Sequence, residues 1–158
     1  IAFVWCLIMF FMMPYWHIYG KQNLSNEAYR TTPEAYLAKT QAMVDKYKVR
    51  EITEQNIPVV HPVPGSDVYL IARLWNFWPV LELEEGQTYR LHIMSTDWLH
   101  GFSLQPENIN IQIHPGYEHI VTLTPTKEGT YSIICNEYCG INHHTMASKL
   151  FVVKPKKG

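Results

Sequence analysis

A short stretch near the C-terminus, ICNEYCGINHHTM from Ile134 to Met146, contains two cysteines, two adjacent histidines and a methionine. Cys135 and Cys139 are four positions apart, and His143 follows four positions after the second cysteine. Met146 comes three positions later. Thiolates, imidazoles and thioethers are soft ligands, and together they favour copper over harder metal ions. The spacing therefore predicts a copper site in this loop.

Other chemistries are compatible with part of this pattern. Zinc binds two Cys and two His in structural sites, although Met is not a usual zinc ligand. A disulfide between Cys135 and Cys139 would form in an oxidising compartment. A mononuclear blue-copper site uses one Cys, two His and a weak axial ligand, so this loop has one Cys too many. The surplus thiolate instead suits two metal ions bridged by two sulfurs.

A second imidazole must come from outside the loop. The stretch DWLHGF at 97–102 supplies His100, which we expect at the end of a strand and just before a Gly-Phe turn. Loops at the end of a rigid β-sandwich can gather ligands without disturbing the core. We therefore expect His100 to join the cysteine loop.

Short alternating strands are expected to position these ligands. From Ile57 onward, apolar and polar residues alternate in runs such as YRLHIM at 89–94 and INIQIH at 109–114, separated by turn residues. This pattern is typical of antiparallel β-sandwiches and barrels. About 100 residues suffice for one such core. We predict a mainly β domain over 57–158, with the copper loop before its last strand.

Residues 1–19 are predicted to form a transmembrane helix. They contain no Lys, Arg, Asp or Glu, and about 18 apolar residues approach the minimum that spans a bilayer. Trp16 and Tyr19, followed by Lys21, are typical of a membrane interface. A signal peptide is disfavoured because a basic start and a small-residue cleavage site are missing. The chain begins with Ile, so we expect residues before position 1 that could complete the span.

Residues 20–56 are expected to form a linker that contains one helix over about 33–49. Thr31, Pro33 and Glu34 combine a helix cap, a first-turn proline and an acidic residue three positions after the cap. We expect this helix at or near the membrane surface. Its apolar face could rest on lipid, on a partner subunit or on the chain's own domain.

The Cys-x3-Cys-x3-His-x2-Met loop and the upstream His-Gly-Phe stretch together resemble a known family. They are similar to the binuclear copper A domain of cytochrome c oxidase subunit II. The similarity covers about 68–153, and the predicted membrane span also fits that subunit. The CNEYCG loop, the Asn108–Asn110 stretch and the single visible span are most similar to the B-type heme-copper oxidases.

The resemblance implies a cupredoxin-like Greek-key β-sandwich with two copper ions. It assigns Cys135 and Cys139 as bridging thiolates and His100 and His143 as terminal imidazole ligands. Met146 would be a weak thioether ligand, and the backbone carbonyl of Glu137 would be the other weak ligand. The resemblance also suggests that the Glu137 side chain binds a magnesium ion at a subunit interface, although B-type relatives need not keep that site.

The family position also distinguishes the two adjacent histidines. His143 matches it, whereas His144 falls one residue out of register. Of the other histidines in the β region, His92, His114 and His119 are expected on the surface. His61 is expected in a loop without a ligand partner.

An aromatic cluster at Trp75–Trp78 is expected to be the electron entry patch. Exposed aromatic residues suit a transient docking surface. Phe77 and Trp78 are the favoured residues, while Trp75 alternates inward as plausibly as outward.

The function implied by the resemblance is electron entry into a terminal heme-copper oxidase. Such a subunit accepts electrons from cytochrome c and passes them to heme in subunit I, where oxygen is reduced to water with proton translocation. The copper domain would face the periplasmic side of the inner membrane, with other subunits as further partners. The net charge of −1 gives no sign of a nucleic-acid partner.

Two other classes share parts of this pattern. Nitrous oxide reductase carries the same copper centre on a much larger chain, so length disfavours it. A quinol oxidase subunit keeps the fold and span as a copper-free assembly subunit but lacks the copper ligands.

Overall fold

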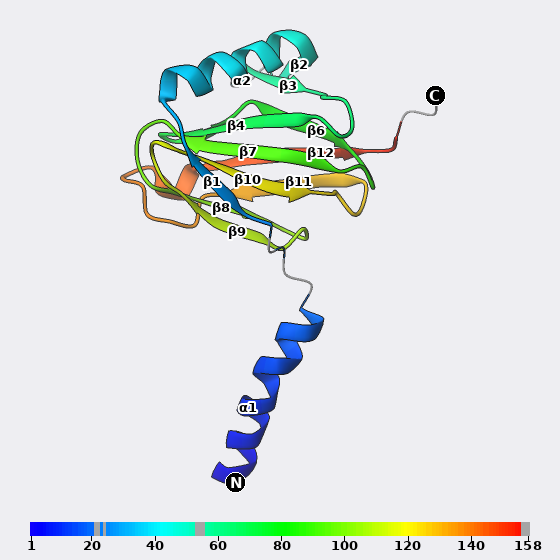
Figure 1. Cartoon of the computed structure of the whole chain (residues 1–158), viewed down its shortest axis with the longest axis vertical. Helices are drawn as coiled ribbons and strands as arrows, with labels where there is room; N and C mark the ends of the chain where they lie inside the picture. Colours follow the sequence, from blue (N-terminus) through cyan, green and yellow to red (C-terminus); the bar gives the residue numbers. More distant parts are fainter. Residues whose placement is uncertain (21–22, 24, 53–55, 156–158) are drawn as a thin grey trace.

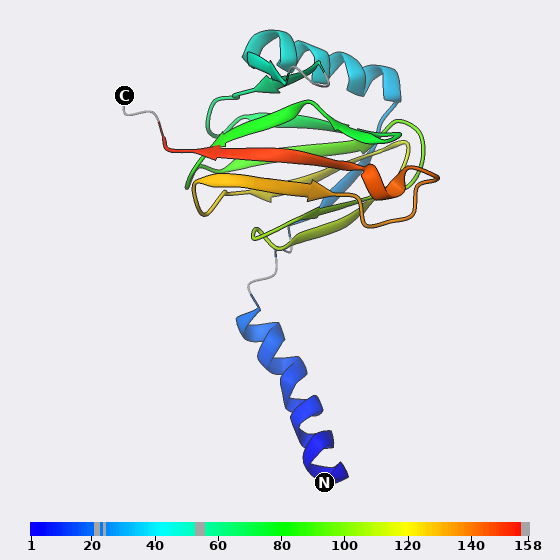
Figure 2. The ribbon, with the colours of Figure 1, turned by 180° about the vertical axis from the view of Figure 1, so that it is seen from behind.

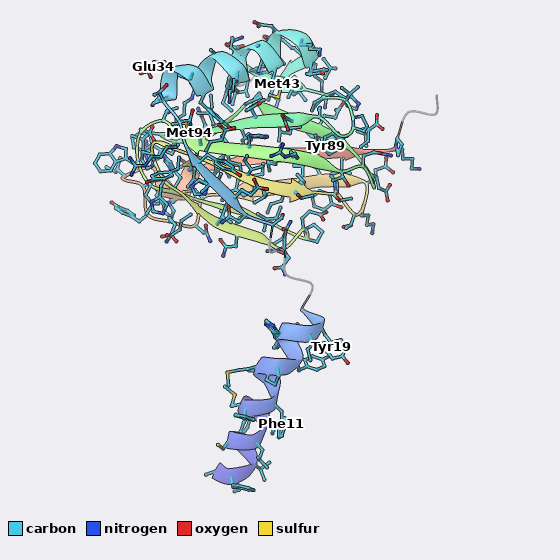
Figure 3. The ribbon with its side chains drawn as sticks, in the orientation of Figure 1. Phe11, Tyr19, Glu34, Met43, Tyr89 and Met94 are labelled. Atoms are coloured by element: carbon cyan, nitrogen blue, oxygen red, sulfur yellow. The ribbon has the colours of Figure 1, made fainter. Side chains whose placement is uncertain are left out.

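A computed structural model describes residues 1–20, 23, 25–52 and 56–155. One isolated helix, α1 (Ala2–Tyr19), leads into a β-rich domain (Figure 1). Phe11 and Tyr19 project from α1 with no neighbouring element around them (Figure 3). By length and composition α1 can cross a membrane. Lys21, expected as the first charge at the membrane surface, lies outside the described residues.

The domain consists of two sheets that pack face to face. The first has the order β1-β10-β7-β4-β5, and the second has the order β2-β3-β6-β12-β11-β8-β9. The strands of the first sheet are β1 (Glu27–Arg30), β10 (Tyr117–Leu123), β7 (Tyr89–Ser95), β4 (Asp67–Arg73) and β5 (Asn76–Trp78). Those of the second are β2 (Lys48–Ile52), β3 (Ile57–Val60), β6 (Val80–Glu84), β12 (Ala147–Val153), β11 (Gly129–Ile134), β8 (His100–Leu104) and β9 (Ile109–Ile113).

Alternating side chains fill the space between the sheets. On β7, Leu91 and Ile93 are buried in the main core, whereas Arg90 points to solvent. The core also takes Phe77 and Phe102, whose rings meet edge to face with centroids 6.0 Å apart. The prediction of a mainly β domain is confirmed.

Helix α2 (Pro33–Tyr47) covers the outer face of the first sheet. The Thr32 side chain caps its N-terminus by accepting a hydrogen bond from the Ala35 amide at 3.4 Å. Its buried residues include Tyr36 and Met43, and the Met43 sulfur accepts a hydrogen bond from the Tyr69 amide at 3.2 Å (Figure 3). The helix therefore packs on its own domain. It lies on the side of the domain opposite α1, and its expected place near the membrane surface stays a prediction (Figures 1 and 2).

Two histidines expected on the surface are buried because neighbouring elements cover both sides of the sheet. His92 lies between Glu118, at 2.5 Å from its Nδ1, and Asp67, at 3.2 Å from its Nε2. His119 accepts a hydrogen bond from the His114 backbone amide at 3.3 Å, and burial lowers its pKa, with a further contribution from the nearby His114. His114 is exposed, as expected.

The region predicted as a linker also contributes two strands. β1 pairs antiparallel with β10, and β2 pairs antiparallel with β3. The Asn23 side chain donates to the Thr122 carbonyl at 2.8 Å, and the Asn108 side chain donates to the Gly20 carbonyl at 3.2 Å. These contacts attach the segment after α1 to the edge of the domain.

Candidate metal centre

The predicted ligands meet at one end of the sandwich. His100 begins β8, and Cys135 follows the last residue of β11, which is antiparallel to β8. The loop then runs through η1 (His143–Thr145) to Met146, which immediately precedes β12 (Figure 2). A backbone hydrogen bond from the Cys135 amide to the Met146 carbonyl, at 3.1 Å, closes this loop.

Six donor atoms form one continuous cluster. The Cys135 and Cys139 sulfurs are 3.7 Å apart, well beyond the roughly 2.05 Å of a disulfide bond, and both thiols are free. The Cys135 sulfur is 3.9 Å from His100 Nδ1 and 3.2 Å from the Glu137 carbonyl oxygen. The Cys139 sulfur is 3.6 Å from His143 Nδ1 and 3.7 Å from the Met146 sulfur.

These separations fit metal coordination. Ligand atoms bound at about 2.0–2.3 Å around a tetrahedral ion lie about 3.3–3.8 Å apart. Each sulfur has its own imidazole and its own weaker donor, while the two sulfurs also contact one another. A donor set of this kind suits two soft ions that share the thiolates.

Most of the cluster is shielded from water, and His143 and Glu137 are half-buried. His100 is fully buried, and Cys135, Cys139 and Met146 are nearly so. Burial raises the pKa of the Cys139 thiol to about 12, with further contributions from its hydrogen bond to Cys135 and the charge of that residue. The metal-free thiol is thus protonated at neutral pH, and metal binding must displace a proton.

Asp97 fixes the orientation of the His100 ring. Its Oδ1 lies 2.7 Å from His100 Nε2 and accepts from the Trp98 amide at 2.7 Å, while Oδ2 accepts from the Leu74 amide at 2.7 Å. Burial alone would raise the pKa of Asp97, but these hydrogen bonds and the His100 charge lower it. Nε2–H then faces the carboxylate, and Nδ1 faces the sulfurs. Sequence reasoning gave Asp97 no role, although its position three residues before His100 was a usable signal.

Comparison with known proteins relates this site to a family. Residues 76–153 match the model of the cytochrome c oxidase subunit II periplasmic domain. This part of the chain is similar to that family. The matched segment holds all six donors of the cluster, so the resemblance seen in the two motifs is confirmed.

Curated relatives carry the same name. Cytochrome c oxidase subunit 2 of Thermus thermophilus is 36% identical over 86 residues, which cover 54% of this chain and 64% of that protein. Probable cytochrome c oxidase subunit 2 of Streptomyces coelicolor is 35% identical over 79 residues, which cover 50% of this chain and 25% of that protein. The matched region thus spans less than two thirds of either relative's length.

Solved structures confirm the fold. A heme-copper terminal oxidase dimer contains a chain with 19% identity and a TM-score of 0.58, and the alignment covers 96% of this chain and 95% of that chain. Rusticyanin from Thiobacillus ferrooxidans has 18% identity and a TM-score of 0.53, with 84% and 99% of the two chains covered. The expected cupredoxin-like sandwich after one apolar helix is therefore correct.

The β domain presents different exposed aromatic residues from those expected. Phe77 is 0% exposed, because on the three-residue strand β5 it points into the core, so its place in a surface patch is wrong. Trp78 is half-buried, with the Arg73 guanidinium 5.7 Å from its ring centroid. Trp98 and Tyr138, 65% and 80% exposed, are the large aromatic side chains beside the cluster.

A hollow of about 390 Å³ lies between these two aromatic residues and the cluster. Trp75 forms part of its wall and donates through Nε1 to the Cys139 carbonyl at 3.3 Å. The remaining lining is mostly apolar and consists of Leu74, Leu99, Cys139 and Gly140. An apolar approach therefore leads from the surface to a cluster cysteine.

The two remaining expectations concern His144 and the Glu137 side chain. His144 is exposed and supplies no donor to the cluster described above. Glu137 accepts a hydrogen bond from the Gln112 side-chain amide at 3.0 Å. Among the described residues, the group of three or more His, Cys, Asp or Glu donors is His100, Cys135 and Cys139, so a magnesium ion on Glu137 would need donors from elsewhere.

Proposed function

We propose that this chain is the electron-entry subunit of a terminal heme-copper oxidase. His100, Cys135, Cys139, His143 and Met146, with the Glu137 carbonyl, would hold two copper ions. The observation that carries this proposal is the pair of buried free thiols 3.7 Å apart, each with its own imidazole and weak donor. When bound, the copper pair supplies reversible one-electron transfer.

The chain's own residues suit electron transfer rather than substrate turnover. The hydrogen bond between His100 and Asp97 and the backbone hydrogen bond between Cys135 and Met146 hold the donors in place before metal binds. Burial excludes water from His100, Met146 and the two cysteine sulfurs. A rigid, dry cage changes little when the charge changes, which keeps the reorganisation cost low. No open ligand position is required.

Electron entry is proposed at the apolar hollow. Trp98 and Tyr138 form its exposed rim, and the Trp75 hydrogen bond links its wall to the Cys139 backbone. Exposed aromatic residues around a small apolar hollow suit brief contact with a cytochrome c. Trp78 is proposed to form the edge of this surface.

The remaining assignments follow from the family. Helix α1 would cross the inner membrane once, with the copper domain on the periplasmic side. Subunit I would receive the electron at its heme and reduce oxygen to water with proton translocation, and other subunits would complete the complex. A magnesium ion on Glu137 would be shared with a neighbouring subunit.

Copper loading and reduction kinetics test the proposal. The whole chain in detergent should bind two copper ions, and reduced cytochrome c should then pass one electron to each loaded chain in a rapid-mixing experiment. Cys139→Ser should abolish both properties, while Cys6→Ser, outside the cluster, should change neither. Failure of the wild-type chain to bind copper would favour the copper-free assembly subunit of a quinol oxidase.

A further inference from the structure

Two adjacent loop residues are bonded to alternate residues of one strand. The Asn136 side chain donates to the Asn110 side-chain oxygen at 2.8 Å, and the Gln112 side chain donates to Glu137 Oε1 at 3.0 Å. Residues 110 and 112 lie on the same face of β9 because side chains alternate along a strand. The two bonds therefore act side by side on one peptide unit of the loop. We call these four residues the loop clamp.

Gly101 allows this peptide to lie directly against β8. A Cβ atom at Gly101 would be 2.0 Å from Asn136 Oδ1 and 2.8 Å from the backbone nitrogens of Asn136 and Glu137. Real Cβ atoms do not approach this closely, so only glycine fits here. The peptide is thus pressed on Gly101 from one side and held to β9 by the clamp.

The carbonyl that follows this peptide belongs to the metal cluster. The Glu137 oxygen lies 3.2 Å from the Cys135 sulfur, which donates to it in the metal-free chain. This oxygen belongs to the 137–138 peptide, which begins at the Glu137 Cα atom, so displacement of Glu137 would move it away from the sulfurs. The clamp residues Asn110, Gln112 and Asn136 are exposed, so their hydrogen bonds contribute little to the core.

We propose that Asn110 and Gln112 are positioning residues that aim the Glu137 carbonyl at the copper pair. This inference rests on the proposed function, because it concerns a weak ligand of that copper site. Weak axial ligands tune the potential of copper centres. Outer residues that orient a ligand commonly change metal affinity by about 10- to 100-fold when they are replaced.

Gln112→Leu is the direct test, with Gln87→Leu as the matched control. Gln87 lies in the turn before β7, at the end of the sandwich away from the cluster. The whole chain in detergent is loaded with copper, and its visible spectrum, copper hyperfine splitting and midpoint potential are recorded. We expect Gln112→Leu to keep two copper ions and wild-type thermal stability. Its spectrum and potential should shift, and copper loss to a chelator should accelerate about tenfold.

A reciprocal exchange separates positioning from a general structural role. Gln112→Glu places two carboxylates opposite each other, which should repel and displace the loop. The double variant Gln112→Glu with Glu137→Gln restores one amide-to-carboxylate hydrogen bond with the roles exchanged. Its spectrum and potential should therefore return towards wild type, although Gln112→Glu alone is shifted.

Two different failures are distinguishable. Copper bound to all variants with wild-type spectra and potentials, or shifts that simply add in the double variant, would overturn the clamp and leave the proposed function intact. A wild-type chain without copper would overturn the proposed function and the clamp together.

Discussion

A histidine that binds metal through one ring nitrogen needs a partner that fixes the other nitrogen, because the ring can otherwise rotate and exchange tautomers. Asp97 is that partner for His100, and it is itself held by two backbone amides. Such carboxylate–histidine pairs orient the ligand and raise its basicity. At the residue scale, the site therefore depends on side chains that never touch the metal.

Asp97→Asn should weaken copper binding by about 10- to 100-fold, because the neutral amide stabilises the bound imidazole less well. Competition with a copper chelator would measure this change on the whole chain. Asp45→Asn, an exposed carboxylate on α2, serves as the control and should bind copper like wild type. Equal affinity for all three chains would show that Asp97 does not orient His100.

Met146→Leu should leave two copper ions bound but shift their midpoint potential. Leucine has a similar volume and keeps the apolar packing at this nearly fully buried position, so folding should be preserved. What it lacks is the thioether, which lies 3.7 Å from the Cys139 sulfur. Spectroelectrochemical titration would detect the shift. An unchanged potential would show that Met146 is not a ligand.

Gly101→Ala should lower the free energy of unfolding by about 1–3 kcal/mol, the typical cost of an added methyl group in a packed site. The new Cβ would collide with backbone atoms, which cannot move aside as the end of a flexible side chain could. Urea denaturation of the metal-free chain would measure the loss. Wild-type stability would mean that the loop does not rest on β8.

At the scale of elements, an ion-pair cluster ties the edge strand β2 to the rest of its sheet. Arg50 on β2 and His61, just after β3, both contact Glu82 on β6, at 2.5 and 3.2 Å. Burial alone would raise the pKa of Glu82, but Arg50 and His61 outweigh it and lower the pKa. The charged carboxylate therefore stabilises the folded chain.

Glu82→Gln should flatten the acid dependence of stability. The pKa of Glu82 is lower in the folded chain than in the unfolded chain, so the unfolded chain takes up a proton first as the pH falls. Wild type therefore loses stability from about pH 4.5 down to the lowered pKa of the folded chain. The variant should be less stable at neutral pH and should lose less on acidification. Urea midpoints between about pH 7 and about pH 3 would show this, with Glu128→Gln on the exposed surface as the control. Parallel curves for wild type and Glu82→Gln would contradict it.

Most strands from Ile57 onward could be predicted from the sequence because alternation reports directly which face is buried. The exception is β8, which begins at His100 and contains Gly101 and Phe102, where a turn was expected. The short strands β1 and β2 could not, because their residues are almost all exposed and carry no such signal. His92 misled the prediction for a related reason. It alternates like a surface residue, but Glu118 and the Tyr69 ring cover it.

The candidate site likewise contains residues that the sequence could reveal and residues that it could not. The five proposed side-chain ligands follow from a dense local motif and one upstream histidine, whereas the Glu137 carbonyl is proposed from the family resemblance. Asp97 gave a local signal, because it lies three positions before His100, whereas Gln112 depends on a contact across the fold with Glu137. Phe77 was misplaced because a three-residue strand offers too few positions to decide which side chain points inward.

At the scale of the whole molecule, α1 and the copper loop occupy different parts of the chain's surface. α1 extends away from the domain, whereas the loop lies at one end of the sandwich (Figures 1 and 2). β1 pairs with β10 at the edge of the domain, and the Asn108 side chain donates to the Gly20 carbonyl just after α1.

Phe11→Lys should weaken membrane insertion, because a lysine near the centre of a spanning helix costs about 2.5–3.5 kcal/mol. Alkaline extraction of membranes would measure the fraction retained. Tyr19→Lys, at the last residue of α1, should be tolerated because a lysine there can reach the interface. Equal retention of the Phe11→Lys chain and wild type would show that α1 does not span the bilayer.

The central claim is that two copper ions share the two thiolates as one electron-transfer centre. Electron paramagnetic resonance of the copper-loaded whole chain, together with copper analysis, tests it most directly. We predict two copper ions per chain and one unpaired electron whose hyperfine pattern shows equal coupling to both copper nuclei. A single copper ion with a simple four-line pattern would contradict the claim and indicate a mononuclear carrier.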